Sequence, residues 1–388
     1  MIEIHGDCAA GLEAVRDAFA ASFDGSPDMG AALAIRHRGE LVVDLWAGTA
    51  DPRTHAPWQA DTLSVIFSCT KGITAILAAQ LVDEGLIDYD DLVTEHWPEY
   101  GAAGKGDTRI RDLLSHRAGL PAPAQPIPLD GIGDWDAIVA QLAAQEPLWE
   151  PGTAYVYHAI THGWLMGEVI RRVTGMSVGQ RFRQTIADPL GVDTWIGLPR
   201  ALHDRVAEMR VGESLARLTI QQEAEAPAEG PDWLKLAMTL GGALPRELVG
   251  DGAGFNLPHV REAEIPGAGG ISTARALATI WSATFTETDG VRLLSDEVLE
   301  EATEPQSWGE PLIPIPGPWP RWGMGFQLDS DARHYLTASG YGHDGAGGQV
   351  AFADPQAQVG FAFLTNQLEA IDDVRATRIV DALRAAIL

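Results

Sequence analysis

The spacing of apolar residues predicts a helix and a hairpin near the start of the chain. Residues 8–23 are expected to form the helix, because apolar side chains recur at helical spacing at Leu12, Val15, Phe19 and Phe23. Residues 32–48 hold two apolar, β-rich runs around Arg38-Gly39-Glu40, which predicts the hairpin. The apolar run after residue 72 then predicts a buried helix that ends at Gly85.

The middle of the chain is predicted to be mostly helical. Helical patterns cover residues 108–119, with Thr108 as the cap, and residues 160–174 and 176–190. Residues 117–134 are rich in Pro and Gly and predict a loop. Residues 225–270 are also loop-like, and such segments often contact a substrate.

Strand character returns in the last third, at residues 322–328, 347–354 and 358–366, before a final helix from about 370 to 387. This order predicts an α+β fold in which an antiparallel sheet, flanked by helices, is assembled from both ends of the chain. We place the sheet domain at 1–95 and 266–388. A largely helical inserted domain is placed at 96–265, with the active site between the two domains.

Composition narrows the class of protein. The chain has 388 residues, of which 46% are hydrophobic and 21% charged, as in an ordinary soluble globular protein. Only Cys8 and Cys69 are present, so a disulfide framework is not expected. The N-terminus lacks a signal-peptide pattern, and no apolar stretch approaches the ~20 residues of a membrane span. A cytoplasmic location is the expectation.

The charge balance limits the partners. Fifty-four acidic residues against 27 basic ones give a formal net charge of −27. Such a surface repels nucleic acid and anionic lipid, so we expect neither as a partner. A small-molecule substrate is expected instead, and a homo-oligomer is possible. Adaptation to solubility or salt is the simplest explanation of the charge itself.

The sharpest local signal is Ser68 followed three residues later by Lys71. Ser68 lies where a strand-like run turns into a helix, and residues three apart share a helix face. A serine hydroxyl needs a neighbour that accepts its proton, and a lysine with a depressed pKa can do so. An N-cap serine with a surface lysine is the structural alternative. The chain has only three lysines, at 71, 105 and 235, so a serine three residues before one of them is not readily explained by chance.

Two further segments carry potential chemistry. Tyr155 and Tyr157 precede a helix, and a tyrosine near a lysine can serve as base and later as acid. The run from Gly342 to Gly348 would let backbone N–H groups approach a developing oxyanion. Taken alone, each segment has an ordinary explanation, aromatic packing for the first and a hairpin turn for the second.

Other site chemistries lack their motifs. There is no Gly-x-Ser-x-Gly elbow, no Walker A motif and no dinucleotide fingerprint. His158 and His162 are four apart, but no glutamate follows the first, so a zinc site is not expected. No cofactor and no metal are therefore predicted. His116 is expected to cap backbone carbonyls at a helix end.

In order and spacing, these pieces resemble the serine β-lactamase and penicillin-binding-protein superfamily. The closest branch is the class C β-lactamase-like esterases known as family VIII carboxylesterases. The resemblance covers nearly the whole chain. It rests on SCTKG (68–72), WPEYGAAGKG (97–106), LLSHRAGL (113–120), WEPGTAYVYHAITHGWLMGEVIRRVTG (149–175), GAGGIST (267–273) and GYGHDGAGG (340–348).

The resemblance implies a β-lactamase/transpeptidase-like fold and a role for each matching residue. Ser68 would be the acylated nucleophile, Lys71 its proton-relay partner, and Tyr157 the tyrosine of the family's Tyr-x-Asn element. The backbone N–H groups of Ser68 and Ala346 would hold the oxyanion. His343, with Asp344 and Gly345, stands where penicillin-binding proteins have Lys-Thr-Gly.

Two departures from the family pattern bear on the substrate. His158 and Ala159 follow Tyr157, so the asparagine is missing, and His158 is taken with residues 343–345 as a substrate contact. A histidine at 343 would be largely neutral at pH 7, unlike the family's lysine. Anionic β-lactams should bind poorly, and neutral esters avoid this problem. Candidates to line an acyl or alcohol pocket are Trp149, Trp233, Phe255 and Trp322, although packing in the core is the ordinary explanation for each of them alone.

The predicted function is a serine carboxylesterase that hydrolyses short- to medium-chain carboxylic esters through an acyl-enzyme on Ser68. An amidase, a D-aminopeptidase-like peptidase, a transesterase or a weak β-lactamase on the same scaffold is the alternative. A non-catalytic scaffold or ligand-binding protein is a second class. It is disfavoured because the serine, the lysine and the tyrosine are all present.

Overall fold

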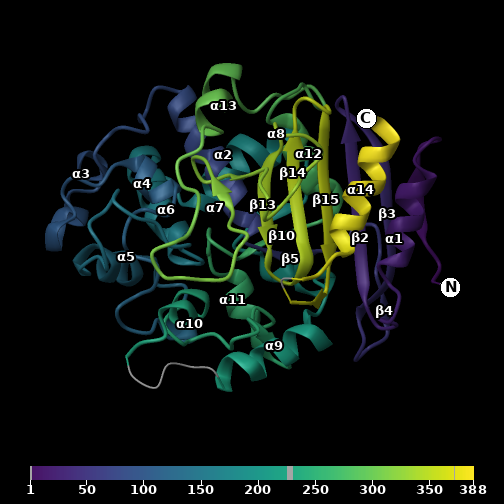
Figure 1. Ribbon diagram of the computed structural model, residues 1–388, viewed down its shortest axis with the longest axis horizontal. Helices are drawn as coiled ribbons and strands as arrows, with labels where there is room; N and C mark the ends of the chain where they lie inside the picture. The colour runs from purple at the N-terminus through teal and green to yellow at the C-terminus, as the bar shows by residue number, and fades with distance from the viewer. Residues whose placement is uncertain (1, 225–229, 371) are drawn as a thin grey trace.

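The main sheet joins the two ends of the chain (Figure 1). The computed structural model describes residues 2–224, 230–370 and 372–388. Within them, nine strands form one sheet in the order β1-β3-β2-β15-β14-β13-β12-β11, with β4 paired to β3. Its neighbouring strands are antiparallel, which confirms the predicted α+β fold. The strands are β1 (His5–Cys8), β2 (Gly30–His37), β3 (Glu40–Asp51), β4 (Ala56–Pro57), β11 (Arg321–Trp322), β12 (Gln327–Leu328), β13 (Tyr341–Gly345), β14 (Gln349–Asp354) and β15 (Val359–Thr365).

The predicted hairpin is confirmed as β2 and β3. Arg38 and Gly39 form its turn with φ values of 56° and 82°. Two successive residues with positive φ are typical of the tight turns that match the twist of paired strands. The predicted helix at 8–23 begins later, as α1 (Glu13–Ala21), because Gly11 has a φ of 90° and residues 5–8 pair with β3 instead.

The sheet is covered on both faces, and its strand residues divide between them. On β15, Phe361 and Phe363 pack towards α1 and α14 (Arg375–Ile387). Ala362 and Leu364 point the other way, where α12 (Ala274–Ala283) lies across the sheet. Both faces of the strand are therefore apolar because helices cover the sheet on both sides.

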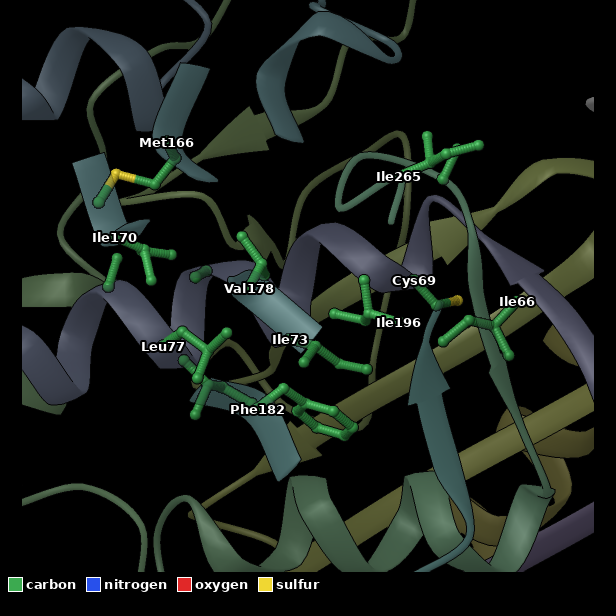
Figure 2. Packing of buried hydrophobic residues seen from close by; sticks show 14 of the residues in the cluster. Ile66, Cys69, Ile73, Leu77, Met166, Ile170, Val178, Phe182, Ile196 and Ile265 are labelled. Atoms are coloured by element: carbon green, nitrogen blue, oxygen red, sulfur yellow. The ribbon is translucent and has the colours of Figure 1, made fainter. Parts of the chain in front are cut away.

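Helix α2 (Cys69–Asp83) is the centre of the other layer. Every residue from Cys69 to Leu81 is buried, and these include the polar side chains of Thr70, Lys71, Thr74 and Gln80. Gly85, with a φ of 66°, follows its end, so the predicted buried helix is confirmed. Figure 2 shows side chains of α2 beside those of α6 (Thr161–Thr174) and α7 (Val178–Phe182), among them Ile73, Leu77, Met166, Ile170, Val178 and Phe182.

The middle of the chain is largely helical, as predicted. Residues 176–190 form α7, a π-helical turn η3 (Arg183–Ala187) and α8 (Asp188–Leu190). The remaining helices are α3 (Val93–His96), α4 (Ile110–Leu114), α5 (Trp135–Ala144), α9 (Glu213–Ala224), α10 (Trp233–Met238), α11 (Pro258–Glu262) and α13 (Asp296–Ala302), with 3-10 turns η1 (Pro98–Gly104), η2 (Leu129–Gly131), η4 (Arg200–Arg205) and η5 (Ala346–Gly348).

Small strands hold the loops together. A three-stranded sheet has the order β5-β10-β6, and two pairs are β16-β7 and β8-β9. These strands are β5 (Ser64–Phe67), β6 (Thr194–Ile196), β7 (Arg210–Val211), β8 (Val249–Gly250), β9 (Ala253–Gly254), β10 (Gly270–Ser272) and β16 (Gln367–Leu368). The loop predicted at 225–270 thus contains short helices and strands, while its residues 225–229 lie outside the described part of the chain.

Two details of the prediction need correction or addition. Thr108 does not cap α4; Arg109 is the N-cap residue, and its N–H donates to Asp112 Oδ2 at 3.0 Å. Across the described residues, no helix combines the length and the apolar character that crossing a membrane requires.

We predict that Gly163→Ala destabilises the protein although alanine is the better helix former. A Cβ at Gly163, within α6, would lie 2.0 Å from the Gly267 nitrogen. Overpacking of this kind costs about 1–3 kcal/mol, more than the ~1 kcal/mol gained in helix propensity. Urea unfolding should therefore show a lower midpoint. Gly106→Ala is the control, because its Cβ would meet nothing within 4 Å; equal midpoints for the two variants would contradict the prediction.

Candidate active site

Ser68 lies at a strained junction between β5 and α2. Phe67, the last residue of the strand, has a φ of 43°, which is unusual for a large non-glycine side chain. The Phe255 ring packs edge-on against the Phe67 ring at 5.4 Å, and Thr70 Oγ1 donates to the Phe67 carbonyl at 2.5 Å. The sharp turn leaves Ser68 partly exposed between buried neighbours. Its hydroxyl is therefore accessible at the start of a fixed helix.

The Lys71 amine lies one helical turn from Ser68, as the spacing predicts. Its Nζ is 2.9 Å from Ser68 Oγ, and it donates to the carbonyls of Ala159 at 2.5 Å and Gly267 at 2.7 Å. The side chain is completely buried. Burial holds the pKa of this amine well below the ordinary value for lysine, because the charged form loses its hydration.

The Ala159 carbonyl lies at the position where the resemblance predicts an asparagine. The Ala159 side chain itself has no polar group. The backbone at the same position binds the Lys71 amine directly. The departure from the family pattern therefore does not leave this amine without an acceptor.

Tyr157 approaches Ser68 from the segment before α6. Its Oη donates to Ser68 Oγ at 2.9 Å. The Tyr157 ring stacks on Trp322 at 5.3 Å with an interplanar angle of 13°, and the His116 ring meets it edge-on at 4.9 Å. Burial raises the pKa of the phenol, so the hydroxyl keeps its proton. Tyr155 instead donates its hydroxyl to the Gly309 carbonyl.

Strand β13 brings His343 beside this group. The His343 ring lies 5.3 Å from Trp322 and 6.1 Å from Tyr157, and Cys69 Sγ donates to the His343 carbonyl at 3.1 Å. Burial, followed by the nearby Lys71, lowers the pKa of the imidazole to about 3. The ring is therefore neutral at working pH and supplies no fixed positive charge.

The end of β13 approaches the turn that precedes Ser68. A Cβ on Gly345 would lie only 2.5 Å from the Ile66 carbonyl oxygen, so only glycine permits this contact. Ala346 follows directly, at the start of a turn in which Gly347 has a φ of 79°. The Ser68 and Ala346 backbone N–H groups remain the predicted oxyanion donors.

Two predicted substrate contacts have side chains that are bonded to other parts of the protein. The Asp344 carboxylate accepts from Arg333 Nε at 2.7 Å, and alternation along β13 turns it to the face opposite His343. The His158 ring is wholly buried, and both of its nitrogens are bonded to backbone groups, those of Leu120 and Val156. The His158 ring is therefore enclosed, whereas the Asp344 side chain stays partly exposed beside Arg333.

Sequence reasoning missed several groups around Ser68. The carbonyls of Ala159 and Gly267 carry no side-chain signal, so only the fold reveals them. His116 does not cap a helix end; its Nδ1 accepts the His158 backbone N–H at 3.2 Å. Among the candidate pocket residues, Trp322 and Phe255 are buried and pack on the rings of Tyr157 and Phe67, as expected of core residues.

Comparison with known proteins points to one family. A profile of the beta-lactamase family matches residues 19–386. The chain is 35% identical over 362 residues to the esterase/beta-lactamase LipL of Mycobacterium tuberculosis, which covers 90% of this chain and 80% of LipL. A family VIII carboxylesterase of known crystal structure is 37% identical, with a TM-score of 0.87, over 99% of this chain and 100% of that one.

A penicillin-binding protein homologue from Caulobacter crescentus has a similar fold. It is 35% identical, with a TM-score of 0.85, and the match covers 99% of this chain and 100% of that one. These matches confirm the β-lactamase/transpeptidase-like architecture that the sequence motifs imply. The chain belongs to the beta-lactamase family.

Proposed function

We propose that this protein is a serine carboxylesterase that acts through an acyl-enzyme on Ser68. The observation that carries the proposal is the position of Ser68 Oγ, which lies 2.9 Å from both Lys71 Nζ and Tyr157 Oη. A relative named esterase/beta-lactamase and a similar structure named family VIII carboxylesterase, each at least 35% identical, support the same activity.

Lys71 is the base in this proposal. Carbonyl oxygens only accept hydrogen bonds, so Ala159 and Gly267 use two N–H groups of the amine. A neutral amine has two N–H groups, and its lone pair then points to the third neighbour, Ser68 Oγ. The lowered pKa favours this neutral form.

Lys105 provides an internal contrast. This lysine is also buried, but its amine donates to three carbonyls, those of Ala102, Ala143 and Gln145, at 2.8, 2.9 and 2.5 Å. Three acceptors require three N–H groups, and hence the ammonium form. The hydroxyl in place of a third carbonyl is what makes Lys71 suited to accept a proton.

The proposed reaction has two stages, acylation of Ser68 and hydrolysis of the acyl-enzyme. Ser68 Oγ bonds to the ester carbonyl carbon as its proton moves to Lys71 Nζ, while the Ser68 and Ala346 N–H groups bind the oxyanion. The carbon–alkoxy bond breaks as Tyr157 gives its proton to the departing alcohol, and the Lys71 ammonium restores the phenol. Water next attacks the acyl carbon as the neutral Lys71 amine takes one of its protons. The bond between the acyl carbon and Ser68 Oγ then breaks as Lys71 returns that proton to Oγ, and the carboxylic acid leaves.

A neutral ester is the proposed substrate class. The fixed cation that would attract a substrate carboxylate is replaced by an uncharged His343 imidazole, and the whole chain carries a net charge of −27. An ester also has a better leaving group than an amide and needs less acid assistance. Hydrolysis of small uncharged esters therefore fits this site better than cleavage of amides or anionic β-lactams.

We expect Ser68→Ala to abolish turnover of a short-chain chromogenic ester. Loss of the nucleophile removes the acyl-enzyme, so kcat should fall by at least about 10³-fold. A fluorophosphonate probe should label the wild-type protein, and peptide mapping should place the adduct on Ser68. Ser26→Ala, which changes a hydroxyl bonded to Gln367, is the control and should keep full activity. Unchanged turnover in Ser68→Ala would rule out this nucleophile.

The pH profile should reflect the depressed pKa of Lys71. The base must be uncharged, so kcat/KM falls as pH drops through its pKa, and a lowered pKa moves this decline to lower pH. The rise of kcat/KM for a neutral ester should therefore level off well below the pH at which an ordinary lysine loses its proton. With an ordinary lysine as the base, whose pKa is about 10.4, kcat/KM would rise tenfold per pH unit between about pH 7 and 10. A slope of about one in log kcat/KM from roughly pH 7 to 10 would refute Lys71 as the proposed base.

We further expect His343→Lys to improve the capture of anionic β-lactams. A lysine at this position restores the positive charge that the neutral imidazole lacks. The second-order rate constant for acylation of Ser68 by a penicillin should rise about tenfold, measured as loss of fluorophosphonate labelling. His343→Gln, which adds no charge, is the matched control. Equal acylation rates for the two variants would show that a positive charge at position 343 does not improve the capture of anionic β-lactams.

A further inference from the structure

The peptide groups on both sides of Tyr157 are held by imidazoles. On one side, His158 Nδ1 is 2.6 Å from the Val156 carbonyl oxygen, which belongs to the peptide that precedes Tyr157. On the other side, the His158 N–H belongs to the peptide that follows Tyr157, and it donates to His116 Nδ1 at 3.2 Å. Tyr157 is thus fixed through its own backbone by two side chains that do not reach Ser68.

The partners define the tautomer of each ring. A carbonyl can only accept, so His158 carries its proton on Nδ1, and its Nε2 accepts the Leu120 N–H at 3.0 Å. His116 Nδ1 must be unprotonated to accept the His158 N–H, so the single ring proton of His116 lies on Nε2. Both rings are wholly buried, and burial lowers the pKa of His158 to about 4 and that of His116 well below its usual range.

His116 is itself rigidly placed. It follows α4 with a φ of 66°, in the left-handed region, and its carbonyl accepts the Val156 N–H at 3.2 Å. Its ring meets Tyr157 edge-on at 4.9 Å and Trp322 at 4.6 Å. One residue therefore contacts the backbone before Tyr157, the backbone after it and the phenol ring.

We infer that His116 is a positioning residue for Tyr157 and that it acts through the hydrogen bond from the His158 N–H to His116 Nδ1. This role rests on the proposed function. The Tyr157 hydroxyl is useful only at hydrogen-bond distance from Ser68 Oγ, where it stands at 2.9 Å. A displacement of about 1 Å at a reacting group can cost on the order of 10² in rate.

Packing alone does not explain an imidazole at this position. A phenyl ring would fill the same space between Tyr157 and Trp322 without burying a polar group that must lose its hydration. Among the described residues, the hydrogen bond that this ring makes is the one from the His158 N–H. This bond is therefore what distinguishes histidine from an apolar ring of the same shape.

Two substitutions separate the hydrogen bond from the ring. His116→Asn keeps the bond, because the Oδ1 of the new side chain can take the place of Nδ1 and asparagine tolerates positive φ. His116→Phe keeps a ring but removes the acceptor. We expect kcat for a chromogenic ester, and the rate of fluorophosphonate labelling at Ser68, to fall roughly 10- to 100-fold in His116→Phe. In His116→Asn, kcat and the labelling rate should stay within about fivefold of wild type. KM should change little in either variant.

Controls separate this role from a loss of folding. His162→Phe alters another wholly buried imidazole, 5.1 Å from His116, that bonds to neither peptide beside Tyr157, and its kcat should stay within about threefold of wild type. Thermal unfolding of each variant reports stability. If His116→Phe does not fold, His116→Gln replaces it, because its amide lies one methylene too far out to accept the same N–H.

The outcomes are distinct. A folded His116→Phe, or His116→Gln in its place, with wild-type kcat and labelling would overturn the positioning role. The role would also be overturned if His116→Asn lost as much kcat and labelling as His116→Phe, or as the His116→Gln variant used in its place. Wild-type protein that neither hydrolyses esters nor reacts with the fluorophosphonate would overturn the proposed function itself, and the positioning role with it.

Discussion

The site depends on the burial of one lysine amine against two backbone carbonyls. Among the described residues, Lys71 has no acidic partner in contact with its nitrogen, so the cost of burying a charge is not offset by an opposite charge. The carbonyls of Ala159 and Gly267 satisfy a neutral amine and orient its lone pair towards Ser68. In the proposed mechanism, the strained turn at Phe67 and the fixed phenol of Tyr157 serve a serine whose proton this uncharged amine accepts.

The fold supports that amine by surrounding α2 completely. The helix carries both Ser68 and Lys71, and it is buried from Cys69 to Leu81 by the sheet on one side and by α6 and α7 on the other (Figures 1 and 2). Gly163 lets α6 contact the backbone at Gly267, which places that carbonyl over Lys71. The same packing that stabilises the helix therefore sets the dielectric environment of the amine.

The interior of the site and the surface of the protein differ in charge. The chain carries a net charge of −27, yet the rings that surround Tyr157 are uncharged because burial lowers the pKa values of His116 and His343. A neutral imidazole can serve as a hydrogen-bond acceptor in a fixed tautomer, which a charged ammonium or guanidinium cannot. The neutral ring at His343 fits the proposed uncharged substrate, and the rings of His116 and His158 bond the peptide groups beside Tyr157.

The sequence by itself determined the fold class, the hairpin at β2 and β3, the buried helix α2 and the grouping of Ser68, Lys71 and Tyr157. These follow from local periodicity and from motifs whose order along the chain is specific. Only the tertiary structure decided that Ala159 and Gly267 bind the amine, that Asp344 turns towards Arg333, and that His116 and His158 hold the backbone of Tyr157. A backbone carbonyl is present in every residue, and a buried histidine looks the same in sequence whether it binds substrate or peptide. Their roles arise from contacts between segments that are distant in the chain, and local pattern carries no record of those contacts.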